Sequence, residues 1–148
     1  MANTAPTQTV LTVQTATLED SVPLTPDPDH VGLNATMHTV VSGDVSADMI
    51  YPNTGSEIVI VRNTGTAAII TVYSNSCDQG FHTQHDSVSH IASGSGTPTY
   101  KILGPFGPYR WNASYGDGTL KVTDHVRINV DTATTTQIMV VQVLPSGY

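Results

Sequence analysis

Two runs of β-branched residues, each preceded by an Asn-x-Gly turn, constrain the fold of this chain more than any other feature. The turn at Pro52–Gly55 precedes the run Glu57–Val61, and the turn at Asn63–Gly65 precedes Ala67–Tyr73. Turn residues on either side of a Val/Ile run are typical of β-hairpins. The pattern therefore predicts β-strands over both runs, joined as a hairpin.

A second informative stretch is Leu103–Asn112, with the sequence LGPFGPYRWN. Two glycines and two prolines surround Phe106, and the aromatic residues Tyr109 and Trp111 follow. Prolines restrict the backbone and glycines permit tight turns, so this stretch predicts a rigid corner that carries aromatic side chains. It contains no obvious catalytic group, and with the first stretch it indicates a structural module.

Further strand candidates recur along the chain with turn residues between them, and no segment has a convincing helical pattern. Several short strands at this spacing are typical of a sandwich, a jelly roll or a small barrel. We therefore expect an all-β, jelly-roll-like β-sandwich of about eight strands. The further candidates are Thr7–Leu18, Ala35–Val45, Thr99–Leu103, a tight turn followed by a strand within Tyr115–Thr123, His125–Asp131 and Gln137–Leu144.

The length of 148 residues fits one domain, which we divide into an extended N-terminal arm over residues 1–30 and a β-sandwich over residues 31–148. Within the arm, Thr7–Leu18 predicts one edge strand, and three prolines stiffen Ser21–His30. The arm lies either on its own domain or across a neighbour, and the sequence favours neither. Ser74–Thr99 predicts a long polar loop.

Charge and cysteine content exclude several classes of protein. Five basic residues against 12 acidic ones give a net charge of −7, so the chain lacks the basic footprint of a nucleic-acid binder. The single cysteine, Cys77, excludes an internal disulfide framework. We expect no secretory signal at the start and no membrane span, because no apolar run approaches roughly 18 residues.

Metal and nucleophile sites are the first chemical alternatives. Cys77, His82, His85 and His90 are zinc-type ligands, but their spacing matches no standard structural site. The simpler interpretation is a solvated polar loop. The run His85-Asp86-Ser87 does not form a triad by itself, because adjacent residues of a strand point to opposite faces.

Aspartates scattered along the chain suggest calcium, although their order differs from an EF-hand. Turn aspartates more often hydrogen-bond to the backbone, and we favour that role. We expect no catalytic, cofactor-binding or metal-binding residues and no cofactor. The aspartates considered are Asp27, Asp29, Asp44, Asp48, Asp117, Asp124 and Asp131.

The aromatic residues Phe106, Tyr109, Trp111 and Tyr115 form a further candidate site. They are either a platform on which a sugar stacks, or a core cluster or protein contact. Tyr, Trp and Arg are enriched at protein interfaces, and we favour a core or protein contact.

The turn and corner motifs together resemble a group of small β-sandwich proteins of tailed bacteriophages. In that group an aromatic-x-Asn-x-Gly turn and a Val/Ile strand precede a basic-Asn-x-Gly turn, and a Gly-Pro-Phe-x-Pro segment with an aromatic-Asn pair follows. The resemblance covers roughly Ala47 to Leu144 and leaves out the arm. The matching segments are Tyr51–Gly55, Arg62–Gly65, Gly104–Pro108, Trp111-Asn112 and Gly116–Gly118.

The resemblance implies a non-enzymatic capsid decoration or cement protein that binds the major capsid protein and stabilises the expanded head. Such a protein is assembled in the host cytoplasm and lies on the capsid exterior, with no nucleic acid or membrane as a partner. A homo-oligomer is expected, and a trimer would match the local three-fold points of a capsid. The alternatives are a head–tail or tail accessory protein and a carbohydrate-binding β-sandwich module.

Overall fold

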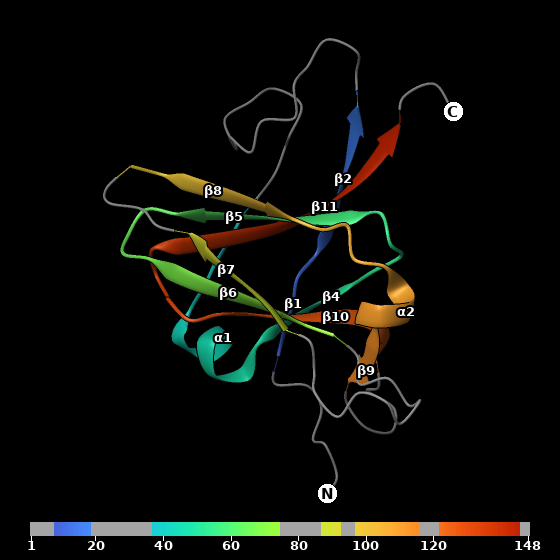
Figure 1. The fold of residues 1–148 in the computed structure, drawn as a ribbon, viewed down its shortest axis with the longest axis horizontal. Coiled ribbons are helices and arrows are strands. Elements are labelled where there is room, and N and C mark those ends of the chain that lie inside the picture. The colour runs from blue at the N-terminus through green and yellow to red at the C-terminus, as the bar shows by residue number, and fades with distance from the viewer. Residues whose placement is uncertain (1–7, 19–36, 75–86, 93–96, 116–121, 146–148) are drawn as a thin grey trace, which may run out of the picture.

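Two β-sheets pack face to face in the computed structural model, which describes residues 8–18, 37–74, 87–92, 97–115 and 122–145 (Figure 1). The first, sheet A, has strands in the order β1-β4-β10-β6-β7, and β9 also pairs with β10. Its strands are β1 (Thr9–Val10), β4 (Met49–Pro52), β10 (Val122–Val130), β6 (Ala68–Tyr73), β7 (Ser87–Ala92) and β9 (Ala113–Tyr115).

The second, sheet B, has strands in the order β2-β11-β5-β8, and β3 also pairs with β11. Pairing is parallel for β1 with β4 and for β2 with β11, and antiparallel elsewhere. The strands are β2 (Val13–Leu18), β11 (Thr136–Pro145), β5 (Glu57–Asn63), β8 (Thr99–Leu103) and β3 (His38–Thr39).

The expected all-β, jelly-roll-like sandwich is confirmed as an all-β sandwich of two mixed sheets. The described residues form eleven strands rather than about eight, because several are very short. Two short helices, α1 (Ser42–Ala47) and α2 (Pro108–Trp111), lie on opposite sides of the view in Figure 1.

The main core lies between the sheets, and alternate residues of the central strands face it. Val59 and Val61 of β5, and Ile138 and Val140 of β11, are fully buried in it. Each fully buried aliphatic side chain contributes roughly 1.5–3 kcal/mol relative to exposure, so these central strands fix the frame of the fold. The strands predicted over Thr99–Leu103 and Gln137–Leu144 correspond to β8 and β11.

The predicted hairpin of the two β-branched runs is wrong. The runs are strands β5 and β6, but β5 pairs with β11 and β8 in sheet B, and β6 pairs with β10 and β7 in sheet A. The turn after β5 therefore carries the chain from one sheet to the other. Asn63 holds it by donating from Nδ2 to the Thr66 carbonyl at 2.6 Å and accepting the Gly65 N–H at 3.0 Å.

Gly65 sits in this turn against Thr135, and substitution there tests the cross-sheet connection. A Cβ added at Gly65 would lie 2.6 Å from Thr135 Oγ1 and 2.7 Å from Thr135 Cβ. We expect Gly65→Ala to lower the free energy of unfolding by about 1–3 kcal/mol, measured by chemical denaturation. Gly43→Ala is the matched control, since nothing lies within 4 Å of its added Cβ. Equal stability of both variants would contradict this packing.

The strand predicted over Ala35–Val45 is also wrong in large part. Of its described residues, 37–45, only His38–Thr39 forms a strand, and helix α1 begins at Ser42, so the expectation of no helix fails here and at α2. The cause is the carboxylate of Asp44, which reaches back to accept the Val41 N–H at 3.0 Å. A helix start leaves backbone N–H groups without intrahelical partners, and this contact satisfies one of them.

The single edge strand predicted over Thr7–Leu18 is two strands in different sheets. β1 pairs with β4 at the edge of sheet A, and β2 pairs with β11 in sheet B. Leu11 stands at the crossing, where its N–H donates to the Ile50 carbonyl at 2.8 Å and its side chain is buried. In Figure 1, β2 and the end of β11 leave the sandwich side by side.

Three further predicted segments are described only in part or not at all. Ser21–His30 lies outside the described residues, so the division of the chain at residue 30 stays a prediction. The segment Ser74–Thr99, predicted as a loop, contains strand β7, which pairs with β6. Residues 116–121 of the predicted turn and strand over Tyr115–Thr123 lie outside the described residues, and the strand predicted over His125–Asp131 corresponds to β10, from Val122 to Val130.

The two sequence stretches that suggested a structural module meet through two buried amides. Asn53 donates from Nδ2 to the Phe106 carbonyl at 2.8 Å and to Asn112 Oδ1 at 2.6 Å. Asn112 returns a hydrogen bond from its Nδ2 to the Asn53 carbonyl at 2.9 Å, and Asn53 Oδ1 accepts the Gly55 N–H at 3.2 Å. This amide clamp joins the turn before β5 to the corner after β8.

Candidate functional site: a groove beside a buried aspartate

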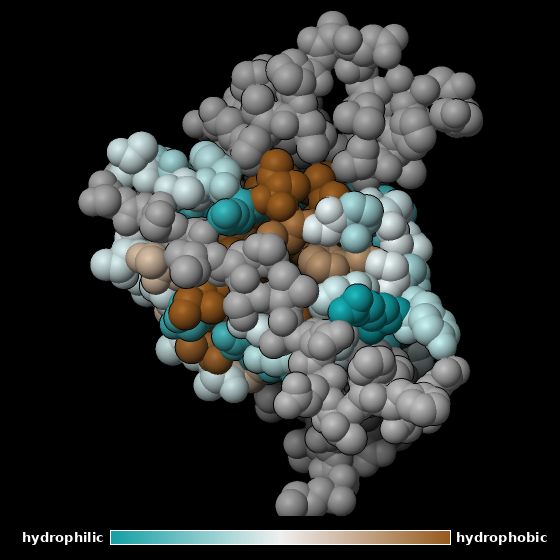
Figure 2. Space-filling view, in the orientation of Figure 1, coloured by the Kyte–Doolittle hydropathy of each residue, from teal (hydrophilic) through white to brown (hydrophobic). Residues whose placement is uncertain are grey.

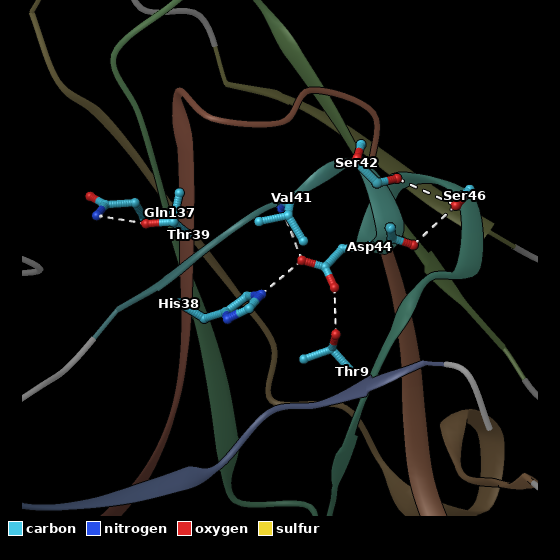
Figure 3. Close-up of polar contacts among 9 residues, drawn as sticks. Thr9, His38, Thr39, Val41, Ser42, Asp44, Ser46 and Gln137 are labelled. Atoms are coloured by element: carbon cyan, nitrogen blue, oxygen red, sulfur yellow. Dashed lines mark hydrogen bonds and ion pairs between the residues drawn. The ribbon is translucent and has the colours of Figure 1, made fainter. Parts of the chain in front are cut away.

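The carboxylate of Asp44 in α1 is buried, with 2% of its surface exposed, and it binds groups from three elements. Thr9 of β1 donates from Oγ1 to Oδ1 at 2.5 Å. His38 of β3 contacts Oδ2 through Nε2 at 2.8 Å, and the Val41 N–H donates to the same oxygen. Figure 3 shows the side chains of Thr9 and His38 approaching Asp44 from different strands.

The electrostatics of this network fix its protonation. Burial by itself would raise the pKa of Asp44, but hydrogen bonds from Thr9, Val41 and His38 outweigh it and hold the pKa below its ordinary value of 3.8. Asp44 is therefore ionised at neutral pH and only accepts hydrogen bonds, so Nε2 of His38 must carry a proton. In the neutral imidazole the other nitrogen, Nδ1, is then an acceptor.

A groove of about 540 Å³ opens beside this network. The N-terminal segment forms one wall, β3 forms the opposite wall, and β11 provides the floor. Asp44 links the two walls, because it binds Thr9 of the first and His38 of the second. The lining residues are Thr9, Val10, Leu11, Thr12, Gln14, Met37, His38, Thr39, Ile138, Met139 and Val140.

The groove has an apolar floor and a polar rim. Ile138, Met139 and Val140 at the bottom are buried residues with at most 2% exposure, and Leu11 beside them is 4% exposed. Threonine and glutamine side chains contribute the polar part of the lining. Within the described residues, the lining includes no Lys, Arg, Asp or Glu. Pockets of this character bind apolar groups oriented by a few hydrogen bonds.

A histidine hydrogen-bonded to a buried aspartate also occurs in catalytic triads, so the surroundings of His38 decide what the pair can do. The described lining of the groove contains no serine or cysteine. The Thr9 hydroxyl donates to Asp44, not to a base that would activate it. In the described part of the chain the pair therefore has no assembled nucleophile, and its geometry is that of a brace between two walls.

Most of the metal-ligand and nucleophile candidates predicted from the sequence lie outside the part of the chain that the structure describes. The candidates that fall outside the described residues are Cys77, His82, His85, Asp86, Asp27, Asp29 and Asp117. The side chains of Ser87 and His90 are not described either. The parts of the chain that the structure does describe bring no three His, Cys, Asp or Glu residues together.

The described aspartates serve as partners of neighbouring protein groups. Asp48 pairs with Arg127 Nε at 3.5 Å, and Asp131 Oδ1 accepts the Ile69 N–H at 2.7 Å. Asp124 adopts a left-handed backbone conformation, with φ of 61°. The role that we favoured for these residues, hydrogen bonding to the backbone, is confirmed for Asp44 and Asp131.

The aromatic candidates divide between core and surface. Phe106 is buried and meets Trp111 edge-on, with ring centroids 5.0 Å apart, so the core interpretation is confirmed for this pair. The guanidinium of Arg110 lies 5.2 Å from the Trp111 ring centroid and covers that face from a stacking sugar. Tyr109 is 85% exposed, and the side chain of Tyr115 lies outside the described residues.

Sequence reasoning missed the groove almost entirely. Asp44 was a candidate only as one of several calcium ligands, and neither Thr9 nor His38 was singled out. Thr9 is 35 residues from Asp44 along the chain, and no local pattern connects them. The one available signal is Asp44 itself, because an acid three residues after the N-cap residue, here Val41, is typical of N-terminal capping.

The outer faces of the two sheets differ in polarity. On sheet A, Arg127 and Asn129 alternate with the core residues of β10 and bind polar groups at the end of α1. On sheet B, the outward residues Ile60, Met139 and Val141 form a second apolar cluster, and Met37 of the groove packs against it. Figure 2 shows hydrophobic surface over β8, where Ile102 is 49% exposed.

The described residues form an all-β sandwich with a groove beside Asp44 and a second, buried apolar cluster on the outer side of sheet B. Comparison of the chain with known protein families, curated protein sequences and solved structures finds no match. The resemblance to phage virion proteins therefore stays a prediction. Among the described helices, none combines the length and the apolar character needed to cross a membrane.

Proposed function

We propose that this chain is a non-enzymatic virion protein that decorates a phage capsid by binding the major capsid protein. The observation that carries a docking role is the exposure of large aliphatic side chains. Val10 on β1 of sheet A and Ile102 on β8 of sheet B are each 49% exposed. Exposed apolar surface marks sites where proteins interact.

The use of the buried polar groups supports a structural role. Besides Asp44 and the amide clamp, Glu57 accepts hydrogen bonds from the N–H groups of Thr54, Gly55 and Ser56 at 2.7, 3.0 and 3.1 Å. Burial by itself would raise the pKa of Glu57, but its hydrogen bonds hold the pKa below the ordinary value. These carboxylates and amides stabilise turns of their own chain.

The phage context of the proposal comes from the sequence resemblance. Three of its motif segments, Tyr51–Gly55, Gly104–Pro108 and Trp111-Asn112, are joined by the amide clamp and specify one corner of the fold. A homotrimer at local three-fold points of the capsid exterior would present the same surface of every copy to the shell. The net charge of −7 suits an exterior position, away from packaged DNA.

Co-sedimentation with expanded phage heads that lack the protein tests this function. We expect saturable binding at a fixed ratio to the shell subunits, because every equivalent shell site should be filled. Binding at only a few copies per particle, or only to tailed particles, would replace decoration with a connector or tail role. No binding to any particle would overturn the virion proposal, and sugar-array binding would then test the carbohydrate alternative.

A further inference from the structure

We propose that the slot occupied by residues 8–18 accepts the same segment of a second copy of this chain, so that neighbouring copies exchange strands β1 and β2. The proposal rests on the homo-oligomer of the proposed function, because it names the contact between its copies. The segment lies in both sheets, with β1 beside β4 in sheet A and β2 beside β11 in sheet B (Figure 1).

The segment is held by parts of the chain that are distant in sequence. Both of its pairings are parallel, whereas every other strand pairing in the described residues is antiparallel. Parallel neighbours cannot be joined by a tight turn, so no short connection ties the segment to its slot. Thr9 binds Asp44, 35 residues along the chain, and the Leu11 N–H donates to the Ile50 carbonyl. An identical segment of another copy would make the same contacts, which is the basis of exchange between copies.

The slot has to be filled in every copy. Leu11 is 4% exposed and packs in the main core, so its removal would leave a cavity. The buried carboxylate of Asp44 would lose the Thr9 donor, and the backbone edges of β4 and β11 would lose the strands that now pair with them. Each copy therefore needs residues 8–18, either its own or those of a neighbour.

The chain has to reverse its direction to return from β2 to its own β3. β2 runs parallel to β11 and ends at Leu18 opposite Pro145, whereas β3 is antiparallel to the same strand and begins at His38 opposite Ile138. At the rise of a strand, these two points of β11 lie about 23 Å apart. The chain between Leu18 and His38 reaches roughly 60 Å when extended, so it is long enough to join the same copy or a neighbour.

The amino-acid sequence of this connection favours the neighbour. It contains Pro23, Pro26 and Pro28, and prolines favour an extended path over the reversal that return to the same copy requires. A path onto a second copy needs no such reversal. Insertion into the chain's own slot keeps the advantage of a tethered segment, whose effective concentration is on the order of millimolar. Exchange is therefore expected where copies are held together at that concentration, as in an oligomer or on a shell.

Cross-linking between two differently labelled chains tests the exchange. Thr15 of β2 lies opposite Gln142 of β11, so one full-length chain carries Thr15→Cys, the other Gln142→Cys, and both carry Cys77→Ser. The two are mixed in denaturant, refolded together at high concentration and treated with a short bis-maleimide. We expect a covalent heterodimer. Thr15→Cys mixed with Gln137→Cys is the matched control, because Gln137 lies opposite Thr39 instead of β2. No heterodimer from the first pair, or equal yields from both pairs, would overturn the proposal.

Linking the segment to its own slot gives the converse test. A single chain with Thr15→Cys, Gln142→Cys and Cys77→Ser is refolded at low concentration and linked internally by the same reagent. Sedimentation equilibrium then compares it with the unlinked Cys77→Ser chain up to about millimolar concentration, the range where tethered and free segments compete. We expect the unlinked chain to self-associate and the linked chain to stay a monomer. Equal self-association of both, or of neither, would overturn the exchange.

The outcomes separate this proposal from the proposed function. If the chains exchange strands in solution and bind no phage head, the exchange stands and the virion role fails. If heads bind a chain that shows neither the specific cross-link nor self-association, the decoration role stands and the exchange fails.

Discussion

Asn53→Ala is expected to lower the free energy of unfolding by about 3–5 kcal/mol, the largest effect of any single substitution that we predict. The side chain is 4% exposed and makes three hydrogen bonds. Truncation leaves the Phe106 carbonyl, the Asn112 amide oxygen and the Gly55 N–H without this partner. Each unsatisfied buried group costs roughly 1–3 kcal/mol. Urea denaturation at neutral pH measures the loss.

The chemistry of the clamp is tested by Asn53→Asp, which keeps the size of the side chain. A carboxylate still accepts the Gly55 N–H, but it has no donor for the Phe106 carbonyl or Asn112 Oδ1, and it adds a buried charge. It should therefore destabilise at least as much as alanine. Gln142→Ala, which removes an exposed amide bonded to Thr54 and Ser56, should cost under about 0.5 kcal/mol. A similar small loss for Asn53→Ala would show that the clamp is dispensable.

The strands that sequence reasoning found are those whose signal is local. The run Glu57–Val61 is β-branched and preceded by a turn, and it forms the core of β5. The run Gln137–Leu144 lies within β11, which like β5 has neighbours on both sides in sheet B. In both cases burial on the two faces of a central strand requires the continuous apolar sequence that made the prediction possible.

The pairing of strands was not predictable from the same signals. The turn at Asn63–Gly65 has the residues of a hairpin, yet it passes from sheet B to sheet A. What directs it is contact with a distant segment: the Thr64 N–H donates to the Thr135 carbonyl at 3.0 Å, and Gly65 packs on the same residue. Turn chemistry specifies a local backbone path and carries no information about such a partner.

The candidate site could not be predicted from local sequence patterns either, because its residues come from distant parts of the chain. Its two walls come from β1–β2 and β3, and the floor comes from β11 near the opposite end of the chain. Asp44 was visible as an acid, but its role depends on Thr9 and His38, which the fold brings to it. The helix that carries Asp44 was hidden by the β-branched residues before it, which favoured a strand.

Asp44→Asn is expected to lower the free energy of unfolding by about 2–4 kcal/mol at neutral pH. The carboxylate accepts three hydrogen bonds, and an amide with one donor end cannot accept all of them. Asp131→Asn is the matched control, because Asp131 is exposed and accepts only two hydrogen bonds, from the Ile69 N–H and the Thr132 hydroxyl. It should cost under about 1 kcal/mol.

The difference between wild type and Asp44→Asn should depend on pH. The pKa of Asp44 is lower in the folded chain than its ordinary value of 3.8, so the ionised form stabilises the fold. This contribution is fully present above the unfolded pKa and is lost as the pH falls through the folded pKa. Denaturation curves from pH 7 to below pH 3 should therefore converge at the acid end. A difference independent of pH would assign the effect to shape instead of charge.

The same substitution should loosen the groove, because Asp44 is the group that binds both of its walls. Without the full set of acceptors, β1 loses the Thr9 contact and is held mainly by its short pairing with β4. Hydrogen exchange of the Leu11 N–H, which bonds to the Ile50 carbonyl, should accelerate more than that of the Val61 N–H in central strand β5. If both amides accelerate equally, the carboxylate supports global stability only, and its role in holding the groove walls fails.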